Sequence, residues 1–274
     1  MSFLASVRTP EASGTLIGLA SDFWTDQTPM RSAPHPPLLS YYKSEEDRGA
    51  WVHGLFNRTA SHYDRLEALV GLGMGSWFRE VSLRDAGLVP GMKVLDVGTG
   101  TGLLASAAVR IIGDASAVTA VDPSAPMLEH AKVPAGVSLA TGSAEELPVA
   151  ASCIDFLCMG YALRHISDLS AAFTEFHRVV RPGGHVCILE LTLPRRAMAR
   201  MILKTWLHGL VPKIAALVAP RSDAPLLMRY YWDTIAACVP PATIMRTLAE
   251  AGFVGVERRV NLAIFSSYRA RKPL

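Results

Sequence analysis

The sequence has little cysteine, and its cysteines follow no ligand or disulfide pattern. Only 4 of the 274 residues are Cys, and Cys153 and Cys158 are separated by four residues with no matching pair after them. This spacing argues against a zinc site and against a small domain stapled by disulfides. Cys158 and Cys187 lie in apolar segments, which is typical of free thiols in a reducing cytoplasm. The sequence therefore predicts no metal centre and a cytoplasmic location.

An excess of one charge is also missing. Lys plus Arg number 27 and Asp plus Glu number 24, which gives a net charge of +3 without a dense basic run. Nucleic acid is therefore not an expected partner. No stretch of 18 residues is both free of charge and long enough to span a bilayer, and the N-terminus shows no signal-peptide pattern. A mean hydropathy of +0.25 nevertheless leaves open an apolar substrate, a subunit interface or membrane contact.

The chain length allows one large domain or two small ones. Residues 1–43 carry four prolines within nine residues and show no sustained period, which predicts a loosely ordered N-terminal extension. This extension is either a dispensable tail or a flap that covers the site or contacts a partner. Ser44 is predicted to cap the first of two or three helices within residues 45–87. The main domain is predicted over residues 44–274.

Short apolar strands then alternate with helices. The predicted strands cover residues 93–98, 117–122, 136–142, 153–163 and 185–193, and a closing hairpin covers 254–270. Strands that are continuously apolar and separated by helices are buried on both faces, so the class is α/β with a parallel sheet between helices. Residues 195–240 interrupt the alternation as a helical insertion.

A glycine-rich loop carries the strongest functional signal. Residues 94–102 read VLDVGTGTG, in which a strand ends, three alternate glycines follow and a helix begins. Glycines let the backbone turn sharply and approach a ligand, and the N–H groups of the next helix then face that ligand. The predicted cofactor loop is Gly98, Thr99, Gly100 and Gly102. The loop alone is a weak motif, because NAD, FAD and methyltransferase enzymes all use one.

Two acids favour S-adenosylmethionine (SAM) as the cofactor. Asp96 lies two residues before the first glycine, and Asp122 ends the next strand, 20 residues after Gly102. Asp122 can accept hydrogen bonds from both ribose hydroxyls. Asp96 would repel a pyrophosphate but suits the positive sulfonium and amino groups of SAM. The alternatives are a turn without a ligand and, for Asp122, a helix cap.

Four motifs carry a family resemblance. VLDVGTGTG, VDPSAPML, GSAEELP and RPGG together resemble the class I SAM-dependent methyltransferases, and residues 56–270 resemble the ubiquinone/menaquinone C-methyltransferase family. FNRTASHYDRL (56–66), YALRHISD (161–168) and residues 228–253 carry the narrower match. The resemblance implies a Rossmann-like, seven-stranded, mostly parallel sheet with helices on both faces and a C-terminal antiparallel hairpin. It adds Pro123 and Met127 to the predicted cofactor site.

The chain departs from this family at two places. Gly-Ser-Ala at residues 142–144 replaces the Gly-Asp-Ala whose acid binds the adenine amino group. The hydroxyl of Ser143 can accept the same hydrogen bond without charge assistance, so Ser143 and Ala144 are predicted beside the adenine, with Glu145 as an alternative acid. His165 replaces the Asn of the family's Arg-Asn pair.

The second departure bears on catalysis. If a ring carbon is methylated, a neighbouring hydroxyl must lose its proton, and a histidine with an ordinary pKa near 6.5 suits that task. Arg164 can stabilise the resulting oxyanion, and the resemblance ties this Arg to proton removal through water. We predict His165 and Arg164 as the catalytic pair; the alternatives for His165 are a loop histidine that caps the helix at Asp168 and substrate binding alone. Tyr63 and Tyr161 are predicted to shape the pocket near the sulfonium, or only to pack.

The segment 195–219 predicts a long helix with two unlike faces and a kink at Pro212. One face is apolar, at Leu203, Leu207, Leu210, Ile214 and Leu217. Another carries a cation or a histidine at every fourth residue, at Arg196, Arg200, Lys204 and His208. The helix is either a lid packed on the domain or, in addition, a peripheral contact with anionic lipid at the inner face of the membrane.

Together these patterns predict a SAM-dependent methyltransferase of quinone biosynthesis that acts, at carbon, on a hydrophobic aromatic or quinol-type small molecule. The alternatives are a natural-product O- or C-methyltransferase with another acceptor, a catalytically silent binding protein in a biosynthetic complex, and a nicotinamide oxidoreductase. The oligomeric state stays open, a dimer included.

Overall fold

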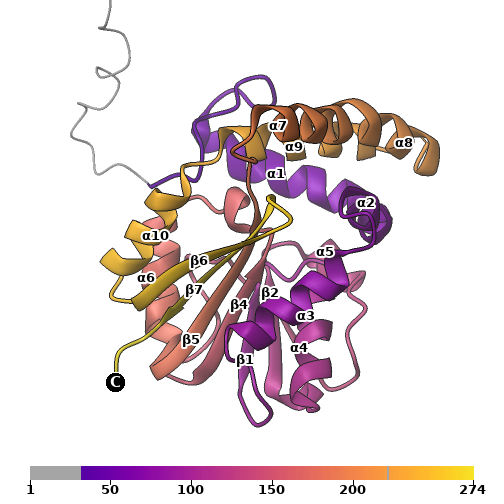
Figure 1. Ribbon diagram of the computed structural model, residues 1–274. Coiled ribbons are helices and arrows are strands. Elements are labelled where there is room, and N and C mark those ends of the chain that lie inside the picture. Colours follow the sequence, from indigo (N-terminus) through magenta and orange to yellow (C-terminus); the bar gives the residue numbers. More distant parts are fainter. Residues whose placement is uncertain (1–31, 221) are drawn as a thin grey trace, which may run out of the picture. The chain divides into compact units, whose positions relative to one another are not determined.

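Seven strands form the central sheet of the domain (Figure 1). The computed structural model describes residues 32–220 and 222–274, and its strand order is β3-β2-β1-β4-β5-β7-β6. The parallel strands are β1 (Val94–Val97), β2 (Val118–Asp122), β3 (Ser138–Thr141), β4 (Ile154–Gly160) and β5 (Val180–Leu191). β7 (Phe265–Arg271) runs antiparallel to β5 and to β6 (Val254–Asn261). The predicted mostly parallel sheet with a C-terminal hairpin is confirmed.

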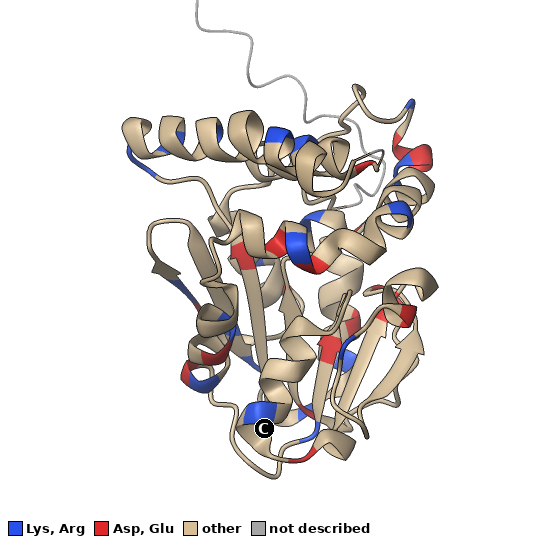
Figure 2. Cartoon of the chain, turned by 90° about the vertical axis from the view of Figure 1, so that its right-hand side faces the viewer, with Lys and Arg blue, Asp and Glu red and all other residues tan. Residues whose placement is uncertain are grey.

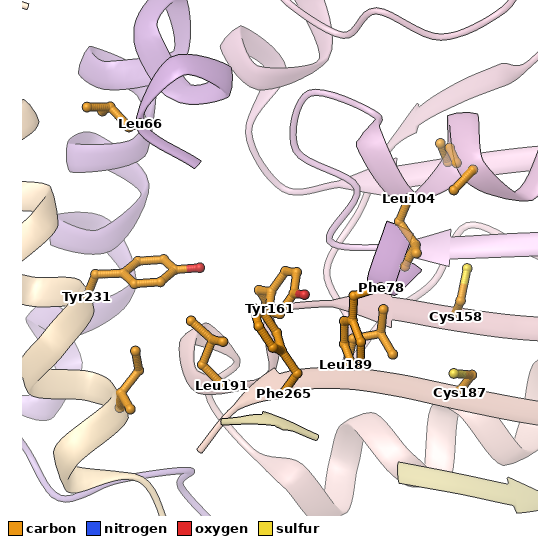
Figure 3. Close-up of a cluster of buried hydrophobic side chains, with 14 of the residues drawn as sticks. Leu66, Phe78, Leu104, Cys158, Tyr161, Cys187, Leu189, Leu191, Tyr231 and Phe265 are labelled. Atoms are coloured by element: carbon orange, nitrogen blue, oxygen red, sulfur yellow. The ribbon is translucent and has the colours of Figure 1, made fainter. Parts of the chain in front are cut away.

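Helices cover both faces of this sheet, and side chains alternate between the two layers. Phe156 and Cys158 of β4 pack with residues of α3 (Gly75–Asp85) and α4 (Leu103–Ile112) in one core, part of which Figure 3 shows. Leu157 and Met159 pack with residues of α6 (Leu169–Val179) and α10 (Pro241–Glu250) in the other. Because both faces of β4 are buried, its residues are apolar apart from Asp155, which is close to what the sequence indicates.

Local capping sets where several helices begin. The side chain of Ser44 accepts the N–H of Asp47 at the start of α1 (Glu45–Thr59), as predicted. The carboxylate of Asp168 accepts two N–H groups at the start of α6. These side-chain acceptors satisfy N–H groups that the first turn of a helix leaves free. After α1 the chain forms a 3₁₀ turn at Ala60–His62 and α2 (Tyr63–Val70) before it reaches α3.

The RPGG motif, residues 181–184, lies within β5. The pairing of β4 with β5 jumps from Ile154–Val180 to Phe156–His185, so the intervening residues bulge out of the ladder. Gly183 has a φ of 76° in this bulge, a conformation that glycine adopts without strain.

The helical insertion consists of α7 (Ala197–Lys204), a π-helical turn (Thr205–Leu210), α8 (Val211–Val218) and α9 (Ala224–Ala237). The predicted apolar face is wrong in part, because Leu210 and Leu217 are exposed while Leu207, Val211 and Ala215 are buried. A π-helical turn holds more residues than an α-helical turn, so it rotates the buried stripe away from the regular spacing of three and four residues. Pro212 lies in the first turn of α8, where a missing N–H is tolerated.

The described part of the predicted N-terminal extension is packed on the domain rather than loose. The carbonyls of Ser32 and Pro34 accept the N–H groups of Leu169 and Val239, at 2.8 Å each. The side chains of His35 and Tyr42 are buried. Residues 1–31 lie outside the described residues.

Candidate active site

A cavity of about 550 Å³ lies at the carboxyl ends of β1, β2 and β4, and α1 contributes to its wall. This volume is in the range of small-molecule sites. Ten residues predicted from the sequence line it: Tyr63, Gly98, Gly100, Asp122, Pro123, Met127, Ser143, Ala144, Tyr161 and His165. Asp96, Thr99, Gly102 and Arg164 do not line it. In the described part of the chain, no group of three or more His, Cys, Asp and Glu is placed to hold a metal ion.

The glycine loop follows the end of β1. Gly98, Gly100 and Gly102 have φ values of 66°, 56° and 85°, a region that side chains disfavour. The N–H groups of Gly98 and Thr99 both donate to the carbonyl of Val121, at 2.8 and 3.0 Å. These bonds couple the loop to the end of β2, so both strand ends present one surface to the cavity.

Asp122 joins the loop to the next helix. Its Oδ2 accepts the N–H of Gly100 at 2.8 Å, and its Oδ1 accepts the N–H of Ser124 at 2.9 Å. Burial raises the pKa of this carboxyl, and each oxygen keeps a further lone pair for a ligand hydroxyl. Ser124 caps α5 (Ala125–Glu129) by accepting the N–H of Met127, so the cap role considered for Asp122 belongs to Ser124.

Asp96 lies on the core side of the loop. It is fully buried, and its Oδ2 accepts the hydroxyl of Thr99 at 2.7 Å, while the thiol of Cys158 lies 3.7 Å from Oδ1. Burial raises the pKa of Asp96 to about 7. Asp96 therefore fastens the loop from the core side and does not line the cavity.

Ser143 and Glu145 lie at another edge of the cavity. The hydroxyl oxygen of Ser143 accepts the N–H of Glu146 at 3.1 Å, which leaves its proton free for a ligand. Oε1 of Glu145 accepts the N–H of Ser167 at 2.6 Å and that of Asp168 at 3.3 Å. Glu145 therefore supports the loop after β4.

The ring of His165 lies among aromatic side chains at the cavity wall. It stacks on Tyr230, with centroids 5.6 Å apart, and meets the edge of Phe56 at 5.0 Å. Neither ring nitrogen has a hydrogen-bond partner among the described residues. Burial, and then the nearby charge of Arg164, hold the pKa of His165 well below its usual value. The ring is therefore neutral at physiological pH and has a free acceptor nitrogen.

Arg164 does not join His165 at the cavity. Its guanidinium is fully buried, pairs with Glu190, donates to the hydroxyl of Thr234 at 3.3 Å and lies 4.5 Å from the ring centroid of Tyr231. The prediction of a catalytic pair is corrected here, because successive residues of the 3₁₀ turn Leu163–His165 project about 120° apart. One side chain faces the cavity and the other faces the protein interior.

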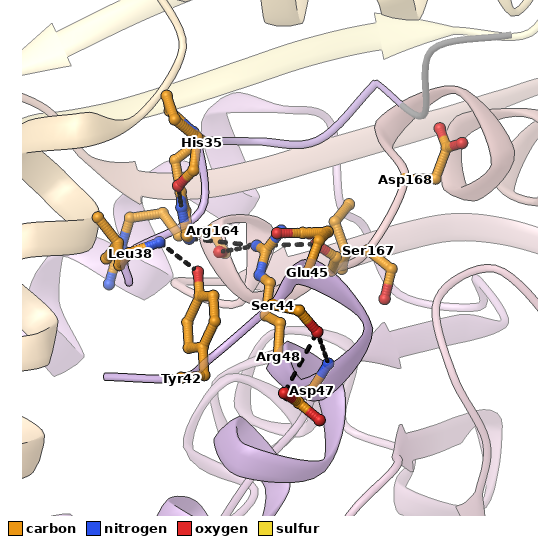
Figure 4. A network of polar contacts seen from close by, with 12 residues as sticks. His35, Leu38, Tyr42, Ser44, Glu45, Asp47, Arg48, Arg164, Ser167 and Asp168 are labelled. Carbon is orange, nitrogen blue, oxygen red and sulfur yellow. Dashed lines mark hydrogen bonds and ion pairs between the residues drawn. The ribbon is translucent and has the colours of Figure 1, made fainter. Parts of the chain in front are cut away.

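Arg48 of α1 holds the turn that carries His165 (Figure 4). Its Nη2 donates to the carbonyls of Arg164 and Ile166, at 3.0 and 3.2 Å, and lies 3.2 Å from Nε2 of His35. Its Nη1 pairs with Glu45 at 2.8 Å. Burial lowers the pKa of His35 to about 4, so His35 is neutral and accepts from the arginine. No local pattern in the sequence indicates this network, because Arg48 and the turn that it holds are 116 residues apart.

Tyr161 follows β4 in a strained conformation. Its φ is 59°, which is rare for an aromatic residue and is often found at functional sites. Its buried hydroxyl has no partner among the described residues. In Figure 3 the side chain of Tyr231 points towards Tyr161. Tyr63 also lines the cavity, and burial raises its pKa well above the ordinary value, so it remains a neutral phenol.

One face of α1 was not predicted as part of the site. Gly49, Val52, His53 and Phe56 line the cavity. Their spacing of three and four residues places them on one side of the helix. That spacing was visible in the sequence, but only the fold shows that this side faces the strand ends.

Comparisons with known proteins identify the family of the chain. Residues 42–269 match the model of the ubiE/COQ5 methyltransferase family. The chain is 28% identical over 232 residues to the ubiquinone/menaquinone biosynthesis C-methyltransferase UbiE of Shewanella woodyi, covering 82% of this chain and 91% of that protein. For UbiE of Shewanella halifaxensis the identity is 28% over 215 residues, covering 76% and 84%.

Solved structures share the fold. A putative S-adenosyl-L-methionine-dependent methyltransferase from Methanococcus maripaludis superposes with a TM-score of 0.57 at 16% identity, covering 80% of this chain and 94% of the other. A SAM-dependent methyltransferase from Thermotoga maritima, described as a possible histamine N-methyltransferase, gives 0.55 at 19% identity, covering 80% and 98%. The matches confirm the predicted class I methyltransferase fold and SAM as the cofactor.

Proposed function

The chain belongs to the ubiE/COQ5 methyltransferase family and is a SAM-dependent enzyme, and on that premise we propose that it methylates a carbon of a hydrophobic, quinol-type ring held against His165. The observation that carries this proposal is the composition of the cavity wall. Aromatic rings and a neutral, unpartnered histidine lie beside the glycine loop in one cavity. An apolar aromatic acceptor would find both packing and a proton acceptor there.

The charges of the cavity suit SAM. Asp122, Glu145 and Asp168 line it, and no Lys or Arg does so among the described residues. SAM supplies an activated methyl group on a positively charged sulfur. Such a wall favours that cation and disfavours the pyrophosphate of a nicotinamide cofactor. The residues proposed to hold SAM are the loop residues Gly98, Thr99, Gly100 and Gly102, Asp122 at the ribose, Pro123 and Met127 beside it, Ser143 and Ala144 at the adenine, and Tyr63 and Tyr161 near the sulfur, with Asp96 below the loop.

His165 is proposed to take the proton of the acceptor hydroxyl. A neutral imidazole offers one acceptor nitrogen, and loss of the hydroxyl proton raises the electron density of the adjacent ring carbon, which is the nucleophile. Once that carbon has taken the methyl group, its hydrogen must leave as a proton to restore the aromatic ring, and the imidazole can return the first proton to the ring oxygen. Phe56 and Tyr230 fix the imidazole plane by ring contacts. Arg164 is proposed to support the turn from the interior, through Glu190, instead of meeting the oxyanion.

Replacing His165 tests this role. His165→Ala is expected to lower kcat by about 10²–10⁴-fold, while calorimetry finds the affinity for SAM little changed. His177→Ala is the matched control, because His177 packs against Phe253 outside the cavity. Full turnover by His165→Ala would remove this histidine from the mechanism.

Mass spectrometry identifies the acceptor. Lipid-soluble quinones from cells without the gene are expected to include a precursor lighter by one methylene than the product in cells that carry it. Purified enzyme, given that precursor as its quinol and SAM with a deuterated methyl, should place the label on a ring carbon. Label on an oxygen, or on an unrelated natural product, would favour the alternative of a different acceptor. Binding of SAM without turnover on any quinol would favour a silent binding protein.

A further inference from the structure

The segment Ala197–Val218, called the arm below, has an apolar surface that nothing in the described chain covers. Helix α7, its first part, has no buried residue. Met198, Met201 and Ile202 are 70%, 63% and 63% exposed. A groove of about 360 Å³ lies among Met201, Ile202, Thr205, Trp206 and Leu210. An amphipathic helix is stable when its apolar face is buried, so this exposed apolar surface indicates that another molecule binds there.

The charge around the arm is of one sign. From residue 191 to residue 222 the sequence holds no Asp or Glu, but it holds Arg195, Arg196, Arg200, Lys204, Lys213 and Arg221. These six cations exceed the net charge of +3, so the rest of the chain carries −3. Figure 2 shows Lys and Arg along the arm. The positive charge of the protein is therefore concentrated where its apolar surface is exposed.

We propose that the arm docks on an anionic lipid surface, with Met198, Met201 and Ile202 in the acyl boundary and the cations at the headgroup phosphates. Exposed apolar and cationic residues on one helical segment are the combination that binds such interfaces. A second copy of this chain is disfavoured on the same face, because each arm carries Arg200, Lys204 and Lys213 and no acid, so two arms would bring six like charges together. This docking goes beyond the proposed methyl transfer and holds whatever the acceptor is.

The arm lies along the lipid surface and does not cross the bilayer. It is the one helix among the described residues that is long and apolar enough to cross a membrane, with a mean hydropathy of 1.3 over 18 residues. However, the arm's own residues Leu207, Val211 and Ala215 are buried against the domain, and α8 packs on α9 and α2. The indole N–H of Trp206 donates to the carbonyl of Val70 at 3.4 Å. A crossing arm would lose these contacts.

Vesicle flotation with the full-length protein tests the charges. The protein should float with phosphatidylcholine vesicles that contain phosphatidylglycerol and much less with phosphatidylcholine alone. The triple variant Arg196→Glu/Arg200→Glu/Lys204→Glu is expected to weaken binding by roughly 100-fold or more. The triple variant Arg84→Glu/Arg246→Glu/Arg271→Glu is the matched control, because it changes the net charge equally at exposed positions elsewhere.

The apolar surface is tested in the same way. Met198→Ser/Met201→Ser/Ile202→Ser should weaken binding, whereas Val89→Ser/Leu139→Ser/Val254→Ser, at exposed positions of other elements, should not. Calorimetric SAM binding checks that each variant is folded. Equal loss in the arm and control variants, or equal flotation with both vesicle types, would overturn the proposal.

Two further outcomes name other occupants. About 0.5 M salt shortens the Debye length to about 4 Å, so it should release a peripherally bound protein from the vesicles. A protein that stays on the vesicles in this salt and in alkaline carbonate would indicate an arm that crosses the bilayer, and would overturn the proposal. Sedimentation velocity distinguishes a second copy. A dimer that the apolar arm variant converts to a monomer, without vesicle binding by the wild type, would also overturn it.

Discussion

Gly98 is a position where an added methyl group tests how the cofactor loop is packed. A Cβ atom there would lie 2.6 Å from the Cβ of Ala162, and the backbone φ is 66°. The left-handed conformation costs an L-residue about 1–2 kcal/mol, and forcing a methyl group into filled space costs about 1–3 kcal/mol. We therefore expect Gly98→Ala to lower the free energy of unfolding by about 2–5 kcal/mol, equivalent to a fall in Tm of roughly 5–15 °C.

Denaturant unfolding separates the two costs. Gly113 has a φ of 77° with nothing within 4 Å of an added Cβ, so Gly113→Ala should show the conformational cost alone. The double variant Gly98→Ala/Ala162→Gly should recover the packing cost relative to Gly98→Ala. SAM affinity should fall in Gly98→Ala and stay unchanged in Gly113→Ala. If the two single variants lose equal stability, the close contact between the glycine loop and Ala162 is refuted.

Three further predictions concern buried charge. The folded pKa of Asp96, about 7, lies above its unfolded value of 3.8, so the wild type loses stability as the pH rises towards 7, whereas Asp96→Asn does not. The difference in unfolding free energy between the two proteins should change by roughly 2–3 kcal/mol from about pH 5 to about pH 8. A difference that stays constant over this range would contradict the prediction. Arg48→Met leaves two carbonyls and Glu45 without their donor and should lower the free energy of unfolding in urea by about 2–4 kcal/mol. It should also lower kcat more than it lowers the affinity for SAM. An unchanged kcat would show that the turn keeps its place without Arg48. Glu190→Gln leaves Arg164 buried without its counter-ion and should lower the free energy of unfolding by about 3–5 kcal/mol. Arg181→Ala is the control and should lower it by less than about 1 kcal/mol, because the pair of Arg181 with Asp155 is partly exposed. Equal losses of stability in thermal unfolding would disprove the argument.

The order of strands and helices was predictable because its signals are local. The helix expected directly after the glycine loop is α4, Leu103–Ile112, with glycines in the left-handed conformation on either side. The strands at the centre of the sheet were visible because both of their faces are buried, so their residues are mainly apolar, with Asp96 and Asp155 as exceptions in β1 and β4. The proposed cofactor end of the site was predictable because its signals are local as well, since the glycine loop begins directly after β1 and Asp122 is the last residue of β2.

The part of the cavity around His165, where the acceptor is proposed to bind, was less predictable. It depends on the directions in which side chains project, and the sequence alone does not show these directions. Arg164 and His165 are adjacent, yet the 3₁₀ turn sends them to different surroundings. The π-helical turn before α8 shifts the buried face of the arm, although the spacing of leucines is regular. Arg48 meets the turn 116 residues further along the chain, and no local pattern indicates such a contact.

The arrangement of charge around the cavity is compatible with both SAM and the proposed neutral acceptor ring. Three buried arginines lie near its wall, and each has its own carboxylate: Arg48 with Glu45, Arg79 with Glu67 and Arg164 with Glu190. None of these arginines lines the cavity. The carboxylates that do line it, Asp122, Glu145 and Asp168, are held by backbone N–H groups instead. The attraction for a positive sulfur is therefore not cancelled inside the cavity, while burial and the nearby charge of Arg164 keep the ring of His165 neutral, as the proposed role of proton acceptor requires.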